Sequence, residues 1–351
     1  MTTTKRIQIG NIAIGGGERI AVQSMLSLPP DMVEENIMQA RSLERAGCDI
    51  VRIAVPDMNG VRLISALKEA VSMPVVADIH FDWRLAIESA CAGVDKIRIN
   101  PGNIGGESRV KAVANACRER KIPIRIGVNS GSIERHILEK YGSATPEAMV
   151  ESAFYHAGLL EKYDFTDIVI SMKSHHVGDM MKAYRLAAQR TNYPLHLGLT
   201  HTGPAKIGFI KSAIAIGGLL TEGIGSTIRV SLTDTPEAEI EAAKEILHAV
   251  GLAPDRPNII SCPTCGRTTI NVAALTARVD CALKDCKAPV TVAVMGCVVN
   301  GPGEAKDADI GITGGGNGKC AVFKKGDVAA TFETQEEAIT YLLGELKNES
   351  I

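Results

Sequence analysis

Residues 50–79 read IVRIAVPDMNGVRLISALKEAVSMPVVADI, and this stretch decides the fold. Its aliphatic ends predict two short strands, over 50–55 and 74–79, and the pattern between them predicts a helix over 59–71. A strand, a helix and a second strand in this order are typical of a parallel βαβ unit.

The same strand-then-helix unit recurs from residue 19 to about residue 249. Strands are predicted over 19–25, 50–55, 74–79, 95–100, 123–128, 167–172, 194–199 and 227–232. The helices that follow are predicted over 32–46, 59–71, 83–92, 106–120, 146–162, 178–191, 207–222 and 236–249. This α/β alternation predicts a closed (β/α)8 barrel of the TIM type, with an open doubly wound sheet as the alternative.

A domain boundary is predicted at GLAPDRPN (251–258), where two prolines interrupt the repeat. We therefore expect a substrate-binding barrel over 1–250 and a small α+β domain over 258–351. The second domain is predicted to have strands near 258–262 and 290–296, helices near 269–284 and 334–347, and a Gly-rich hairpin over 309–326. Within it, GGGNGKC (314–320) lacks the spacing of a phosphate loop and is interpreted as a turn.

Composition excludes several classes of protein. The chain has 351 residues and a formal net charge of −2, which gives no electrostatic case for nucleic acid binding. Its start, MTTTKRIQIG, lacks the apolar stretch of a signal peptide, and no apolar run approaches the ~18–20 residues of a membrane span. We expect a cytoplasmic protein whose cysteines are thiols or ligands, with four single cysteines buried: Cys48, Cys91, Cys117 and Cys320.

Three other cysteines stand beside Gly or Pro turns. Cys262 and Cys265 lie in CPTCGR (262–267), and Cys297 lies in MGCVVNGPGEA (295–305) with Glu304 seven residues further on. Three thiolates and one exchangeable oxygen ligand are typical of an iron–sulfur cluster that keeps one iron available for chemistry.

A zinc site is the rival interpretation. Cys262, Cys265, Cys281 and Cys286 have a spacing close to that of a zinc ribbon. Against it, Cys281 and Cys286 fall in or at the end of a predicted helix, where residues five apart do not face one another.

Cationic side chains lie on the predicted barrel strands. Since strand side chains alternate between faces and the aliphatic neighbours pack on the helices, four arginines should point inward: Arg52, Arg98, Arg125 and Arg229. Lys173 follows the sixth strand, and Asp78 cannot match five cations. The missing counter-charge indicates a small ligand with more than one phosphate, unless the arginines pair with acidic residues of the helix layer.

Polar residues at the carboxyl ends of the strands fit a pocket there. Asn100 shares a face with Arg98, and Ser231 shares one with Arg229. The other candidates are Gln23, Ser24, Asp78, His80, Asn129, Thr200 and His201.

Several long motifs carry a resemblance to a known family. They are CPTCGR, MGCVVNGPGEA, VADIHFD (76–82), RINPGNIG (98–105), IPIRIGVNSGS (122–132) and LTEGIGSTIRVSL (220–232). From about residue 5 to 345 the chain resembles the 4-hydroxy-3-methylbut-2-enyl diphosphate synthase family, iron–sulfur enzymes of non-mevalonate isoprenoid biosynthesis, in its shorter bacterial form.

The resemblance implies an activity and its partners. The barrel would bind 2-C-methyl-D-erythritol 2,4-cyclodiphosphate, and a [4Fe-4S] cluster would be held by Cys262, Cys265, Cys297 and Glu304, the last able to release its iron during catalysis. Electrons from flavodoxin or ferredoxin would open the ring with loss of water. A head-to-tail homodimer is also implied, in which the cluster domain of one chain caps the barrel of the other.

The resemblance also implies residue roles in the barrel. Arg52, Arg98, Arg125, Lys173 and Arg229 would hold the diphosphate. Asn100, Asn129, Thr200 and Ser231 would assist, and Asp78 and His80 would line the same pocket.

Two segments depart from the family pattern. Where the family usually reads TEAG, with a Glu that serves proton transfer or binds a hydroxyl, this chain reads THTG (200–203). Where the family usually reads VQSMTNT, VQSM (22–25) runs into LSLPP (26–30). Three interpretations follow: His201 replaces the Glu as proton donor, the two changes compensate, or the chain is a paralogous reductase of a related phosphorylated substrate. A zinc-stabilised phosphate-binding barrel without a redox role is a further alternative.

Overall fold

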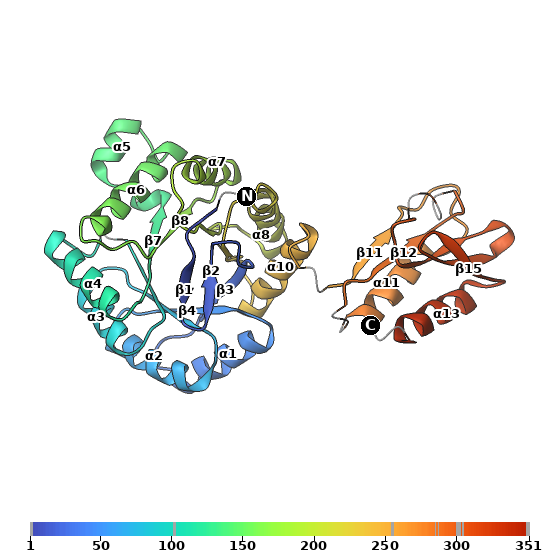
Figure 1. Cartoon of the computed structure of the whole chain (residues 1–351), viewed down its shortest axis with the longest axis horizontal. Coiled ribbons are helices and arrows are strands. Elements are labelled where there is room, and N and C mark those ends of the chain that lie inside the picture. Colours follow the sequence, from blue (N-terminus) through green and yellow to red (C-terminus); the bar gives the residue numbers. More distant parts are fainter. Residues whose placement is uncertain are drawn as a thin grey trace. The chain divides into compact units, whose positions relative to one another are not determined.

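The structure is a computed structural model that describes residues 3–100, 103–253, 256–284, 286, 288–299, 303 and 305–348. The chain divides into two compact units, Met1–Leu252 and Ala253–Ile351 (Figure 1). The division lies inside the segment 251–258, where the strand–helix repeat stops.

The first unit is a parallel barrel. Its strands are β3 (Ala21–Met25), β4 (Ile50–Ala54), β5 (Val75–Asp78), β6 (Lys96–Ile99), β7 (Ile124–Asn129), β8 (Ile168–Lys173), β9 (His196–Leu197) and β10 (Thr227–Ile228). They pair in the order β8-β7-β6-β5-β4-β3-β10-β9, and a bridge between Ile170 and Leu195 joins β8 to β9. The predicted barrel is confirmed, although β9 and β10 are shorter than the sequence predicts.

Helices surround these strands (Figure 1). They are α1 (Val33–Arg45), α2 (Met58–Ala70), α3 (Trp83–Cys91), α4 (Glu107–Glu119), α5 (Arg135–Tyr141), α6 (Pro146–Glu161), α7 (Val177–Ala188), α8 (Ala205–Ser212), α9 (Gly218–Thr221) and α10 (Pro236–Ala249). A π-helical turn over 213–217 joins α8 to α9, and the short α5 was not predicted. Among the described helices, none is long and apolar enough to cross a membrane.

A hairpin that was not predicted closes the amino-terminal end of the barrel. Strands β1 (Ile7–Ile9) and β2 (Ile12–Ile14) pair antiparallel. Their buried isoleucines pack on four residues near the starts of barrel strands, namely Ala21, Ile50, Val76 and Val169. Three-residue strands are too short to show a period, so the pattern missed them. A ligand must therefore enter at the opposite end, which we call the mouth.

The strand register sorts the inward side chains into layers, each built from alternate strands. The strands of such a barrel are tilted, with a shear of about eight residues over eight strands. Residues at the same depth are therefore offset by one position, toward the carboxyl end, from the paired residue on each successive strand. One layer then holds Gln23, Val76, Arg125 and His196. The next layer toward the mouth holds Arg52, Arg98, Ser171 and Arg229, and the one above it holds Met25, Asp78, Gly127 and Gly198.

The second unit is a five-stranded sheet with helices on one face. Its strands are β11 (Asn258–Ser261), β12 (Thr291–Met295), β13 (Ile310–Gly314), β14 (Cys320–Lys324) and β15 (Asp327–Phe332), paired in that order. The helices α11 (Val272–Leu283) and α13 (Gln335–Asn348) contribute to its main apolar core. The glycine-rich run is a turn between β13 and β14, as interpreted, whereas β15 was not predicted.

Candidate functional site

Buried arginines meet one carboxylate in the upper part of the barrel. Arg98 donates from Nη1 to Asp78 Oδ1 and from Nη2 to the Gly127 carbonyl, each at 3.1 Å. Arg52 Nε lies 3.8 Å and His80 Nε2 lies 3.3 Å from Asp78 Oδ2. Arg52 and Arg98 are only 7% and 8% exposed, so they point inward as the strand alternation predicts.

This cluster has more positive than negative groups, and the pKa values of its members shift accordingly. Burial would raise the pKa of Asp78, but Arg52, His80 and Arg98 hold it well below its usual range. Burial lowers the pKa of Arg52 to about 10, against the effect of Asp78. Burial and the nearby arginines also lower the pKa of Lys173 at the end of β8. An anion bound here would relieve this penalty.

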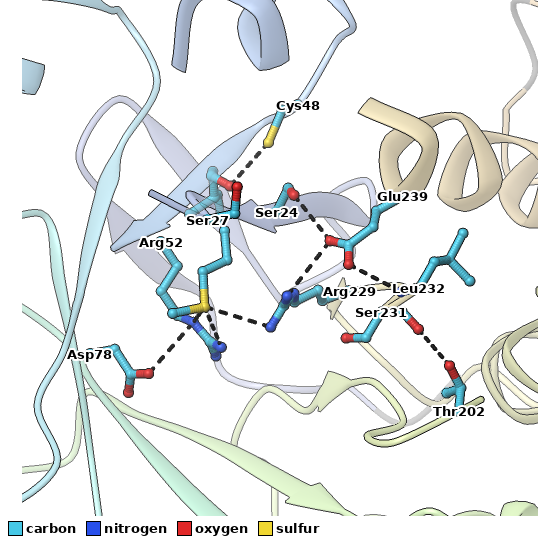
Figure 2. Close-up of polar contacts among 12 residues, drawn as sticks. Ser24, Ser27, Cys48, Arg52, Asp78, Thr202, Arg229, Ser231, Leu232 and Glu239 are labelled. Atoms are coloured by element: carbon cyan, nitrogen blue, oxygen red, sulfur yellow. Dashed lines mark hydrogen bonds and ion pairs between the residues drawn. The ribbon is translucent and has the colours of Figure 1, made fainter. Parts of the chain in front are cut away.

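The alternative that the arginines pair with acidic residues of the helix layer holds at Arg229. Its Nη2 lies 3.6 Å from Glu239 Oε2 on α10, and Ser24 Oγ donates to the same oxygen at 3.2 Å (Figure 2). The Leu232 amide donates to Glu239 Oε1 at 3.1 Å. Glu239 is 6% exposed, so Arg229 has a buried carboxylate of the helix layer as its partner.

The thioether of Met25 lies between the guanidinium groups of Arg52 and Arg229. Met25 Sδ accepts from Arg52 Nε at 3.1 Å and from Arg52 Nη2 at 2.8 Å, and Arg229 Nη1 lies 3.7 Å away. A thioether is a weak, uncharged acceptor. The guanidinium groups of Arg52 and Arg229 can therefore exchange this weak acceptor for a charged one, such as a phosphate oxygen.

Gly127 is required by the position of Arg98. A Cβ at residue 127 would lie 2.2 Å from Arg98 Nε, so any side chain there would displace the guanidinium. The glycine of IRIG (124–127) follows Arg125 by two residues on the same face, which is a signal that sequence reasoning could have used.

The remaining predicted barrel residues are placed as follows. Arg125 is 1% exposed and donates from Nη1 to Gln23 Oε1 at 3.3 Å. Asn100 is buried beyond β6, and Asn129 ends β7. The Ser231 carbonyl accepts from Thr202 Oγ1 at 2.7 Å. His201 is exposed, has a left-handed backbone (φ 53°), and its Nδ1 lies 3.1 Å from Thr200 Oγ1.

We expect Glu239→Ala to lower the free energy of unfolding by about 2–4 kcal/mol, because it leaves a buried guanidinium and two donors without their acceptor. Glu239→Gln keeps an oxygen acceptor and should cost less. Urea unfolding measures both, with Glu241→Ala as the control on an exposed position of the same helix. Equal stability of the Glu239→Ala and Glu241→Ala variants would refute the role of Glu239.

In the second unit, two predicted cysteine ligands follow paired strands. Cys262 follows β11 and Cys297 follows β12, which run parallel. The Gly296 amide donates to Cys262 Sγ at 3.1 Å, and the Thr269 amide donates to the Gly296 carbonyl at 2.9 Å. These bonds tie the loop that carries Cys265 to the loop that carries Cys297.

Cys265 is exposed in this loop. A hydrogen bond from the Arg267 backbone lowers the pKa of its thiol, which favours the thiolate that metals bind. Among the described residues, no three His, Cys, Asp or Glu side chains are gathered as in a closed metal-ion site. Glu304, the predicted fourth ligand, lies outside the described residues.

The cysteines of the rival zinc site are placed differently. Cys281 is exposed on α11, whereas Cys286 follows that helix and packs partly buried against the core. Of the single cysteines, Cys48, Cys117 and Cys320 are buried as expected, but Cys91 at the end of α3 is exposed, contrary to expectation.

Sequence reasoning missed five side chains that shape the barrel interior. They are Met25, Lys96, Gly127, His196 and Glu239. Lys96 and His196 are fully buried. The alternation that placed Arg98 and Asn100 inward also places Lys96 inward, so that signal was present. Glu239 gives no such signal, because its helix contains other glutamates at exposed positions.

Comparison with known families covers nearly all of the chain. The family model described as GcpE TIM-barrel domain matches residues 4–244, and that described as GcpE protein C-terminal domain matches residues 258–348. A protein of Clostridium perfringens (strain 13 / Type A) is 53% identical, over 93% of each chain. One of Caldanaerobacter subterraneus subsp. tengcongensis is 52% identical, over 98% of this chain and 96% of its own. Both are named 4-hydroxy-3-methylbut-2-en-1-yl diphosphate synthase (flavodoxin).

Solved structures share the fold at much lower identity. Dihydropteroate synthase of Stenotrophomonas maltophilia is 15% identical, with a TM-score of 0.53 over 70% of this chain and 98% of its own. 3-Dehydroquinate dehydratase of Geobacillus kaustophilus HTA426 is 15% identical, with a TM-score of 0.51 over 71% and 99%. At such identity the likeness concerns the fold alone.

Proposed function

We infer that this chain, which belongs to the GcpE family, is a 4-hydroxy-3-methylbut-2-en-1-yl diphosphate synthase. This oxidoreductase converts 2-C-methyl-D-erythritol 2,4-cyclodiphosphate to (E)-4-hydroxy-3-methylbut-2-enyl diphosphate in the non-mevalonate pathway. The observation that carries the inference is the buried group of cations around Asp78, whose excess charge suits a cyclic diphosphate.

The diphosphate is proposed to bind on the mouth side of the arginines. Its oxygens would accept from five cationic side chains, Arg52, Arg98, Arg125, Lys173 and Arg229, assisted by Asn100, Asn129, Thr200 and Ser231. Asp78 and His80 would line the pocket, with Asp78 keeping Arg52 and Arg98 oriented before the ligand arrives. A guanidinium held ready in this way loses little rotational freedom on binding, and its fork matches phosphate oxygens.

The second unit is proposed to carry a [4Fe-4S] cluster on Cys262, Cys265 and Cys297, with Glu304 as the fourth ligand. The thiols fit this group because they lie on two loops tied together by hydrogen bonds, and an amide already donates to Cys262 Sγ. When bound, the cluster supplies electrons singly to the substrate. The zinc interpretation has less support, because Cys281 points to solvent on α11 while Cys286 packs against the apolar core.

The electron donor is proposed to be flavodoxin or ferredoxin, and the relatives' names specify flavodoxin. A head-to-tail homodimer is proposed as the working form, since the cationic site and the cysteines belong to different units. A cytoplasmic location is supported by the nine cysteines, all of which are free thiols.

The proposed function is tested on anaerobically purified, cluster-reconstituted protein. The cyclodiphosphate and a strong one-electron reductant are added, and formation of the allylic diphosphate is followed. Product formation supports the assignment. An intact cluster without product would instead favour the paralogous reductase, and a colourless zinc protein would favour the phosphate-binding barrel.

His201 is proposed to donate a proton to the leaving hydroxyl, because its imidazole is exposed next to Thr200. His201→Ala should then lower turnover by about 100-fold or more, with the iron content unchanged. His136→Ala, an exposed histidine on α5, is the control. Unchanged turnover in the His201→Ala variant would show that this histidine carries no proton.

A further inference from the structure

Polar side chains lie below the layer of Arg52, Arg98 and Arg229, and of these the proposed reaction uses only the terminal nitrogens of Arg125. Gln23, Arg125 and His196 share one layer, and the register places Lys96 in the layer beneath. Lys96 and His196 are fully buried, and Gln23 and Arg125 are each 1% exposed. The hairpin β1–β2 closes this end of the barrel, so these groups are sealed from solvent on that side.

Each of these side chains has a nitrogen without a hydrogen-bond partner. The atoms are Gln23 Nε2, Lys96 Nζ, Arg125 Nε and His196 Nε2. The Gln23 Oε1 acceptor nearby is already engaged by Arg125 Nη1. His196 Nδ1 lies 2.7 Å from Thr227 Oγ1, so that ring nitrogen has a partner. On the described inward faces of the barrel strands, every unpartnered buried side-chain atom is a nitrogen.

A site lined only by hydrogen-bond donors favours a ligand that accepts hydrogen bonds and donates none. A water molecule needs acceptors for its own hydrogens as well as donors. A buried ammonium and a buried guanidinium also need a counter-charge, and Asp78 is engaged with Arg52, Arg98 and His80 in a higher layer. Burial lowers the pKa of Lys96, and Arg125 adds to that shift, as expected of an ammonium with no anion beside it.

We propose that the barrel interior binds a small monovalent anion of halide size, with Lys96, Arg125 and His196 as its donors and Gln23 completing the lining. The Thr227 hydroxyl donates to His196 Nδ1, which leaves the ring proton on Nε2, toward the anion. Arg125 gives Nε to the anion and keeps its terminal nitrogens for Gln23 and the diphosphate. This site does not depend on the chemistry proposed for the mouth.

Bromide is the probe in the first experiment. Crystals of the full chain are grown with bromide, with and without inorganic pyrophosphate to occupy the upper arginines, and anomalous scattering is recorded. We expect a bromine peak within hydrogen-bond distance of Lys96 Nζ in both crystals. A water molecule or no density in that place would overturn the proposal. A peak that pyrophosphate displaces would also overturn it, since the position would then belong to the diphosphate site.

Lys96→Met tests the main donor, because methionine is an unbranched side chain that is one atom shorter and carries no charge. The bromine peak should be absent in this variant and present in Lys206→Met, which changes an exposed lysine of α8. In wild-type protein, each tenfold rise of chloride above its dissociation constant, at constant ionic strength with gluconate, should raise the Tm of the barrel by about 3–5 °C. No chloride effect would count against the site even if the Lys96→Met variant failed to fold.

Discussion

Cys297→Ala is expected to abolish reductive turnover and to remove most of the bound iron. Cys297 is 7% exposed and follows β12, beside the loop that carries Cys262 and Cys265. Loss of a partner that merely orients a metal ligand costs about 10–100-fold in metal affinity or activity, and loss of the ligand itself should exceed this. Iron and sulfide analysis, the visible absorption of the cluster and turnover are measured together.

Cys281→Ala is the matched control, because it separates the two interpretations of the cysteines. Cys281 is exposed on α11 and belongs only to the rival zinc set. We expect this variant to keep its iron, its colour and its turnover. If Cys281→Ala lost the metal and Cys297→Ala kept it, the cluster assignment would be wrong and the zinc interpretation right.

Arg98→Met should lower kcat/KM for the cyclodiphosphate by roughly 10²–10⁴-fold, chiefly by raising KM. The side chain is proposed to give the diphosphate two charge-assisted hydrogen bonds, each worth about 1.5–3 kcal/mol. Arg98→Lys keeps the charge and loses the fork, so it should recover only part of the loss. Steady-state kinetics of the reconstituted protein measure all of these effects.

The control for this prediction is Arg118→Met, an exposed arginine of α4 on the helix layer. It should leave kcat/KM unchanged. Circular dichroism shows whether Arg98→Met has kept its fold, since Asp78 still has Arg52 and His80 beside it. If a folded Arg98→Met variant had the wild-type KM, the diphosphate would have to bind away from the arginine layer.

Several features of the fold could be predicted because they depend on local periodicity. Short aliphatic strands alternating with amphipathic helices are sufficient to predict a barrel, and strand alternation is sufficient to turn Arg52, Arg98 and Arg125 inward. The turn at GGGNGKC is set by glycines within the turn itself. In each case the physical cause acts between residues close in the chain, so the pattern is visible there.

Other features depend on contacts between residues far apart in the chain. Ser24 and Glu239 are 215 positions apart, and no local pattern distinguishes Glu239 from the other glutamates of α10. The hairpin β1–β2 is stabilised by the barrel it closes, because its strands are too short to be stable alone. The donor lining around Lys96 exists only because strand register brings side chains of β3, β6, β7 and β9 into two adjacent layers of the barrel.

The sequence by itself therefore determined the barrel and the inward direction of its cations, because both follow from alternation along single strands. The tertiary structure alone decided which cations are neutralised. Arg52 and Arg98 share Asp78, and Arg229 has Glu239, whereas Lys96 Nζ and Arg125 Nε have no partner. The physical reason is that the charge balance of a buried site is set by the closure of the barrel, which brings together side chains from distant strands and helices.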